Sequence, residues 1–136
     1  MGNVFIGILR QARIDFILND AENRVPGNIN ISISSASGET LLHRLDLKGI
    51  SISTGSACDS VNTHLFQVIR EINAPPEFAE GTIRMTFGRA NHPEDASEVA
   101  ASITNVVQRK IVLYLTAYAG YIRGGKEWQK ADVQLR

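Results

Sequence analysis

The chain has 136 residues, of which 43% are apolar and 21% are charged, and these values are typical of one soluble globular domain. Its 14 basic residues balance its 14 acidic residues, so net charge gives no electrostatic reason to expect a nucleic acid or an anionic membrane as a partner. The longest apolar-rich run, residues 111–122, is too short to span a bilayer. The single cysteine, Cys58, excludes an internal disulfide, and no signal peptide is recognisable, so we predict a cytoplasmic protein.

The first half of the chain contains two predicted helices and three predicted strands. Apolar residues at helical spacing predict a helix over residues 4–13, and residues 14–18 alternate as in a strand. The clearest alternation places Ile29, Ile31 and Ile33 on one side of a predicted strand at residues 28–34. Three leucines then predict a helix over residues 39–48 that ends before Gly49, and residues 50–53 predict a short strand.

A polar loop is predicted at residues 54–62, and the apolar stripe that follows predicts a helix over residues 65–72. Residues 82–87 alternate again and predict a strand. This order of elements predicts an α+β (α/β) fold, a small sheet with helices packed on one face.

The last predicted helix begins near Asn91, whose side chain can cap it, with Glu94 three residues on as in a capping box. We assign residues 1–122 to one domain and residues 123–136 to a loose polar tail.

Cys58 lies in the polar loop, among serine, alanine and aspartate residues that offer it no apolar stripe to join. Most free cysteines are small buried hydrophobic residues, whereas an accessible thiol can ionise and attack. The residues alone leave both roles open. A third interpretation, an anion-binding loop before a helix, lacks a phosphate-loop pattern, and Asp59 would repel phosphate.

Several motifs together resemble the C-terminal domain of the cysteine desulfurases, which are class V aminotransferases of the fold-type I pyridoxal-phosphate enzymes. The sequence TGSAC at residues 54–58 resembles their active-site loop. The sequences VPGNINIS at residues 25–32, GISIS at 49–53 and GTIRMTFGR at 81–89 resemble their strands, in the same order and at similar spacing. The resemblance extends from about residue 5 to about residue 112, and it implies the fold of that C-terminal domain.

The resemblance implies two site residues. Cys58 would be the nucleophile that takes sulfur from pyridoxal-phosphate-bound cysteine and becomes a persulfide. Arg84 would bind the α-carboxylate of L-cysteine, for which a planar, permanently charged guanidinium is well suited. Outside the family context, Arg84 is an ordinary exposed arginine of a strand. No metal site is expected, because His43, His64 and His92 are scattered and there is no second cysteine.

The residues that would hold the cofactor are not recognisable. The family's Schiff-base lysine follows a histidine, and none of Lys48, Lys110, Lys126 and Lys130 does. The resemblance therefore implies that pyridoxal phosphate (PLP) is held by a large domain missing from this sequence.

The partners implied by the resemblance are that PLP-binding domain or a full-length desulfurase subunit, a sulfur-acceptor protein and L-cysteine, in a homo- or hetero-oligomer without direct nucleic-acid or membrane contact. Iron–sulfur cluster assembly and tRNA thiolation are among the processes that the family serves. The alternative is a stand-alone, non-catalytic protein-interaction module derived from the same domain.

Overall fold

The computed structural model describes residues 1–20, 25–54 and 75–123. The helices in this part of the chain are α1 (Gly2–Gln11), α2 (Gly38–Asp46), α4 (Pro76–Ala79) and α5 (Pro93–Arg123). The strands are β1 (Phe16–Leu18), β2 (Asn28–Ile33), β3 (Ser53–Thr54) and β4 (Thr82–Thr86). The predicted helix at 65–72, most of the predicted loop at 54–62 and the tail at 124–136 lie outside the described residues.

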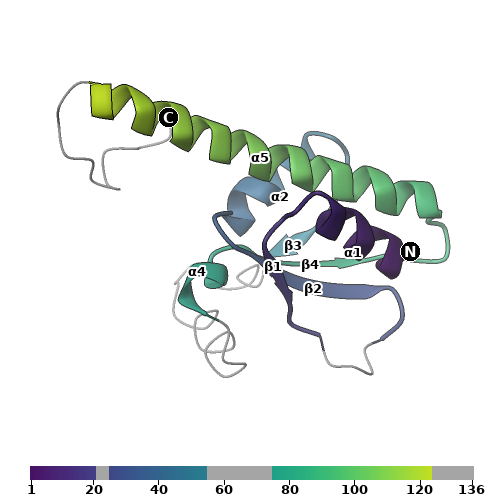
Figure 1. Ribbon diagram of the computed structural model, residues 1–136. Helices are drawn as coiled ribbons and strands as arrows, with labels where there is room; N and C mark the ends of the chain where they lie inside the picture. Colours follow the sequence, from purple (N-terminus) through teal and green to yellow (C-terminus); the bar gives the residue numbers. More distant parts are fainter. Residues whose placement is uncertain (21–24, 55–74, 124–136) are drawn as a thin grey trace.

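The four strands form one sheet in the order β1-β2-β4-β3, and every neighbouring pair is antiparallel. Helices α1, α2 and α5 lie on the same side of this sheet, and the C-terminal end of α5 extends beyond the other elements (Figure 1). Short α4 lies at the opposite side, next to β2. We call the sheet surface that faces away from α1, α2 and α5 the open face.

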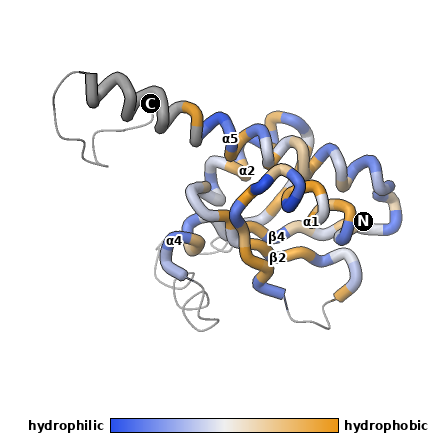
Figure 2. The backbone as a smooth tube through the Cα atoms, viewed as in Figure 1, coloured by the Kyte–Doolittle hydropathy of each residue, from blue (hydrophilic) through white to orange (hydrophobic). Residues whose placement is uncertain are grey.

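The core lies between the sheet and these three helices. Its fully buried large side chains are Phe5, Leu9, Ile29, Ile31, Ile33, Leu41, Leu45, Ile83 and Ile103. Apolar segments of the helices and strands meet in this layer (Figure 2). Burying one such side chain is worth about 1.5–3 kcal/mol, so the isoleucine alternation in β2 supplies a large part of the stabilisation that joins sheet and helices.

Local signals in the sequence explain where α2 begins and ends. The Ser37 side chain accepts a hydrogen bond from the backbone N–H of Thr40 at 3.4 Å, as an N-cap does. At the other end Gly49 has a φ of +74°, a left-handed conformation that glycine adopts without steric cost. The helix predicted at residues 39–48 is therefore confirmed, with bounds that differ by one or two residues.

The predicted cap of the last helix is wrong by one residue. The helix begins at Pro93, and the Asp95 carboxylate accepts hydrogen bonds from the His92 backbone N–H at 2.9 Å and from Asn91 Nδ2 at 3.1 Å. The Asn91 side-chain oxygen accepts from the Gly88 N–H instead, at 2.9 Å. The predicted box of Asn91 and Glu94 is thus replaced by His92 and Asp95, because Asn91 is already engaged in the preceding turn.

Two other features differ from the sequence prediction. The strand predicted at residues 50–53 is shorter and shifted, because only Ser53 and Thr54 pair with β4. Helix α4 is not among the predicted elements, since four residues are too few to show a helical period. No helix among the described residues is both long enough and apolar enough to cross a membrane.

Candidate functional site

Strand β4 places Arg84 on the open face of the sheet. Successive side chains of a strand point to opposite faces, so Ile83 and Met85 are buried under the helices while Arg84 is exposed. Arg84 lies opposite Asn30 of β2 on one side and Ser53 of β3 on the other. The predicted orientation of Arg84 away from the apolar layer is confirmed.

The guanidinium of Arg84 has no ion-pair or hydrogen-bond partner among the described residues. Its cross-strand neighbours Asn30 and Ser53 are neutral and polar, so no carboxylate of these strands competes for its charge. A planar guanidinium in such surroundings can bind a carboxylate through two parallel hydrogen bonds. The site can therefore accept a small carboxylate from the solvent side.

Cys58 itself lies outside the described residues, but the structure fixes both ends of the segment that carries it. Strand β3 ends at Thr54, immediately before residues 55–74, and it pairs with Arg84 and Ile83 of β4. Helix α4 begins at Pro76, just after the segment, and leads directly into β4. The segment thus leaves from one side of β4 and returns to the start of the same strand.

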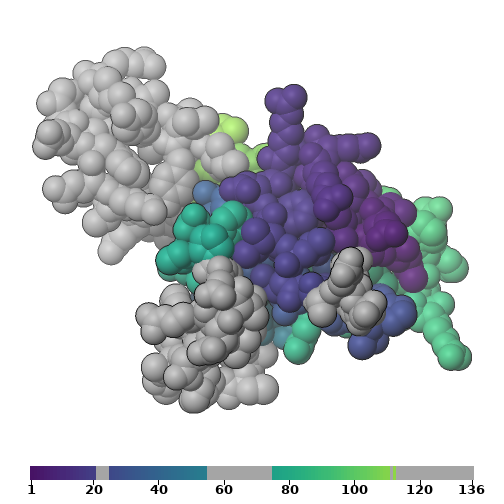
Figure 3. All heavy atoms as spheres, turned by 60° about the horizontal axis from the view of Figure 1, so that its bottom comes forward, coloured from purple at the N-terminus to yellow at the C-terminus, as the bar shows by residue number. Residues whose placement is uncertain are grey.

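A network of polar side chains holds the returning end in place. The hydroxyls of Ser32 and Thr82 share a hydrogen bond of 2.7 Å, and the Thr82 hydroxyl also lies 3.0 Å from the Ala79 carbonyl oxygen, at the end of α4. Asn19 donates from Nδ2 to Ser32 Oγ at 2.8 Å and to Asn30 Oδ1 at 3.1 Å. Ser32 and Thr82 are buried although they belong to the open face, and Figure 3 shows α4 (teal) beside β2 (indigo) at this surface.

Sequence reasoning did not identify this network. Asn19 lies outside every element that the sequence predicts, and the alternation of β2 and β4 predicts only which of their side chains are apolar and face the core. The signal that could have revealed it is the cross-strand pairing of Ser32 with Thr82, which depends on the strand order. One atom of the network, Asn19 Oδ1, is buried without a hydrogen-bond partner among the described residues.

Two close backbone approaches help to fix the geometry around β4. Gly38 donates its N–H to the Glu80 carbonyl oxygen at 2.7 Å, and a Cβ on Gly38 would lie 2.9 Å from the Thr82 carbonyl oxygen. A Cβ on Gly81 would overlap the carbonyl oxygen of Ile33. Only glycine fits at these two positions, so the turn between α4 and β4 stays tight against β2.

The described residues do not fit a pyridoxal-phosphate site. Of the four lysines, Lys48 and Lys110 are described, and both are on the helix side of the sheet. Lys48 is exposed at the end of α2, and its Nζ donates a hydrogen bond to Ser102 Oγ of α5 at 3.2 Å. Lys110 lines a hollow between α2 and α5. Neither lies on the face that carries Arg84.

The prediction of no metal site is untested as a whole, because His64 and Cys58 lie outside the described residues. Within the described part of the chain, no three histidine, aspartate or glutamate residues are grouped as metal ligands would be. His43 is exposed on α2, and His92 is exposed at the start of α5, where its backbone N–H donates to Asp95.

Comparison with known proteins identifies a family. The model of the family described as aminotransferase class-V matches residues 5–99. A cysteine desulfurase IscS from Dictyoglomus turgidum is 37% identical over 106 residues, which cover 77% of this chain and 27% of the relative. A cysteine desulfurase from Klebsiella pneumoniae is 32% identical over 110 residues, which cover 81% of this chain and 26% of the relative.

Solved structures agree on the fold. A NifS-like protein has a TM-score of 0.59 at 19% identity, covering 76% of this chain and 25% of that one. A NifS-like protein from Rickettsia africae has a TM-score of 0.53 at 17% identity, covering 76% and 28%. The predicted fold class is confirmed by these neighbours and by the sheet itself. The chain spans about a quarter of the length of the curated relatives it matches.

Proposed function

Because this chain belongs to the aminotransferase class-V family, whose members depend on pyridoxal phosphate, we propose that it is the sulfur-accepting part of a cysteine desulfurase. We assign the cofactor to residues outside this chain, because the described lysines lie on the helix side of the sheet whereas Arg84 lies on the open face. A cofactor bound to either lysine could not share a site with a substrate bound at Arg84. The chain then contributes a thiol and a carboxylate-binding group.

One observation carries this proposal: Ser53 and Arg84 are direct partners in the sheet. Ser53 precedes Cys58 by five residues, so the segment with the thiol starts beside the guanidinium. A cysteine bound through its carboxylate at Arg84 would have its sulfur within reach of a side chain on a loop anchored there. Two such groups on unrelated surfaces could not act on one small substrate.

In the proposed reaction the Cys58 thiolate attacks the sulfur atom of the substrate cysteine. A sulfur–sulfur bond forms as the carbon–sulfur bond of the substrate breaks, and Cys58 becomes a persulfide. The electron pair of the broken bond stays with the substrate carbon, where the cofactor held outside this chain would stabilise it, and protonation of that carbon gives alanine as the leaving product. The persulfide then passes its terminal sulfur to the thiol of an acceptor protein, in an oligomeric assembly in the cytoplasm. A nucleophile on a loop suits this sequence of events, because it must meet two partners in turn.

Sulfur loading of Cys58 is the first test. The chain is incubated with an active cysteine desulfurase and L-cysteine, and intact-mass spectrometry measures the persulfide. We expect the wild-type chain to gain one sulfur atom that dithiothreitol removes, and Cys58→Ser to gain none. Equal sulfur gain in Cys58→Ser would overturn the assignment of this thiol.

Cysteine binding at Arg84 is the second test. The chain alone should bind cysteine with a dissociation constant above about 1 mM, because an exposed ion pair is worth about 1 kcal/mol or less. In a complex with a cofactor-bearing desulfurase domain, Arg84→Ala should weaken cysteine binding by about 2–3 kcal/mol, and Arg84→Lys should restore part of the loss. Arg10→Ala, an exposed arginine of α1, is the matched control. Unchanged affinity in Arg84→Ala would return Arg84 to the role of an ordinary surface residue.

A second candidate function is a non-catalytic interaction module. It is favoured by the lack of a fitting cofactor lysine among the described residues. The two functions differ in what Cys58→Ala does in a complex with the cofactor-bearing domain. Loss of sulfur transfer supports the desulfurase part, whereas unchanged transfer supports the module.

A further inference from the structure

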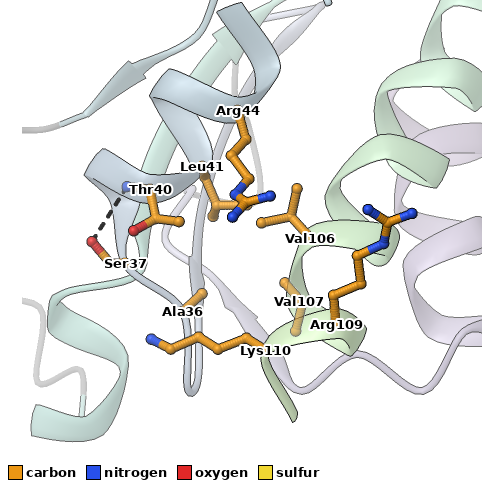
Figure 4. A pocket seen from close by; sticks show the side chains of 9 residues that line it. All are labelled: Ala36, Ser37, Thr40, Leu41, Arg44, Val106, Val107, Arg109 and Lys110. Carbon is orange, nitrogen blue, oxygen red and sulfur yellow. Dashed lines mark hydrogen bonds between the residues drawn. The ribbon is translucent and has the colours of Figure 1, made fainter. Parts of the chain in front are cut away.

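A groove runs between α2 and α5 on the helix side of the sheet, opposite the face that carries Arg84. It consists of two adjoining hollows that share Arg44, Val106 and Arg109. The first hollow has a volume of about 210 Å³, enough for one bulky apolar side chain, and Figure 4 shows the residues that line it.

The floor of the groove is apolar. Leu41 is fully buried beneath the first hollow, Val107 is 4% exposed, and Val106 stands half-buried between the two hollows. At the second hollow Leu47 is 87% exposed, which makes it the most exposed large apolar side chain among the described residues. A surface of this kind gains free energy when an apolar side chain displaces water from it.

The walls of the groove are basic. The Arg44 side chain extends from α2 towards Val106, Arg109 lies on α5, and Lys110 lies at one end of the first hollow (Figure 4), while Lys48 lines the second hollow. No aspartate or glutamate is among the described residues that line either hollow. Because the whole chain carries equal numbers of basic and acidic residues, this concentration of positive charge is a local property of the groove.

We propose that the α2–α5 groove is a docking site for an acidic, amphipathic segment of a partner protein. An apolar side chain of that segment fills the hollow above Leu41, and flanking carboxylates pair with Arg44 and Arg109. The aliphatic stems of these arginines extend the apolar wall while their guanidinium groups stay at the rim. The combination matches the mode in which a helix lays its apolar face into a groove and charged residues at the edge fix its orientation.

The test uses the full chain and a defined probe. The probe is a fluorescein-labelled peptide with leucines at helical spacing and glutamates elsewhere, and fluorescence anisotropy measures its affinity. Arg44→Gln combined with Arg109→Gln should weaken binding about tenfold, since both exposed ion pairs with the probe are lost. Leu47→Ser should also weaken it, and its exposure makes an effect on folding small. Arg10→Gln is the matched control and should bind as the wild-type chain does.

Two control probes separate the contributions. A peptide with lysine in place of glutamate, and one with serine in place of leucine, should both bind at least tenfold more weakly than the acidic probe. Equal binding of the lysine peptide, or an affinity of the double arginine variant within twofold of wild type, would overturn the proposal. So would tighter binding of a single-stranded oligonucleotide than of the acidic peptide at the same salt concentration, since that would assign the groove to another class of ligand.

Discussion

Gly81 is crowded by backbone atoms of Ile33, whereas Gly7 has open space around it. Replacing each of the two glycines with alanine therefore tests how closely β2 packs against the turn before β4. At Gly81 an added Cβ would overlap the carbonyl oxygen of Ile33 and lie 2.9 Å from its carbonyl carbon. The neighbouring atoms are backbone and cannot rotate away, so the strands must separate locally. At Gly7, in the middle of α1, an added Cβ meets no atom within 4 Å.

The expected changes in unfolding free energy have opposite signs. Gly81→Ala combines overpacking, worth about 1–3 kcal/mol, with strain on the 3.1 Å hydrogen bond from the Ile33 N–H to the Gly81 carbonyl, worth about 1 kcal/mol. The sum is a loss of about 2–4 kcal/mol, or about 8–16 °C in melting temperature for a chain of this size. Gly7→Ala should gain about 0.5–1 kcal/mol, because alanine favours the helix.

Urea unfolding followed by circular dichroism measures both values with the same assay. Gly81→Ala should also lower the rate at which Cys58 acquires sulfur, since Gly81 lies where the Cys58 segment returns to β4. A Gly81→Ala variant as stable as the wild-type chain would refute the close approach of the turn to β2, and with it the reasoning that this turn positions the segment.

Three further predictions concern the core, the polar network and the start of α5. Ile103→Ala, at a fully buried position of α5, should cost about 2–5 kcal/mol in urea unfolding, and a cost below 1 kcal/mol would contradict its place in the core. Ser32→Ala removes the buried hydrogen bonds of Ser32 to Thr82 and Asn19 and should cost about 1–3 kcal/mol, while Ser32→Thr should cost less if the hydroxyl is what matters. The hydrogen bond from the His92 backbone N–H, together with the one from the Asn91 side chain, lowers the pKa of Asp95 in the folded chain. The ionised Asp95 carboxylate therefore stabilises the fold above the pKa that it has in the unfolded chain, and this stabilisation is lost as the pH falls below about 4. Asp95→Asn should therefore be less stable than the wild type at pH 7, with the difference shrinking in acid; a difference that is constant from pH 7 to pH 3 would show that charge has no part in it.

The regular parts of the fold could be predicted because their cause is local. Alternation of Ile29, Ile31 and Ile33 requires only that one side of a strand be buried, and the structure buries all three completely. The leucines before Gly49 likewise define a helix and its end without reference to the rest of the chain. Such signals are strong where one face of an element is apolar and the other is not.

The start of α5 shows how a local rule can fail when two templates overlap. Asn91 with Glu94 and His92 with Asp95 both have the spacing of a capping box. Proline is favoured at the first helical position, which selects His92 as the residue before the helix and Asp95 as the acid. The sequence contained this information, but Asn91 is the better N-cap residue by type. Only its hydrogen bond from Gly88 shows that it is used elsewhere.

The candidate site depends on information that the sequence does not contain locally. Arg84 could be placed on the exposed side of its strand by alternation, but its neighbours could not be named until the strand order was known. Placing β4 between β2 and β3 gives Arg84 two neutral partners and brings the start of the Cys58 segment to its side. In another order of the same strands, Arg84 would lie far from this segment or beside a sheet edge, and the family motifs would have no common geometry.

The same alternation that exposes Arg84 also separates the two proposed sites. Ile83 and Met85 face the helices, so β4 contributes its even-numbered side chains to the open face and its odd-numbered ones to the core beneath α5. The groove of Arg44 and Arg109 lies between α2 and α5 on the helix side of the sheet, with the core residues Leu41 and Val107 at its floor. A partner held in the groove therefore does not cover Arg84 on the open face. Because the groove and Arg84 lie on opposite sides of the sheet, the two proposals together predict that docking at the groove leaves the rate of sulfur transfer to Cys58 unchanged.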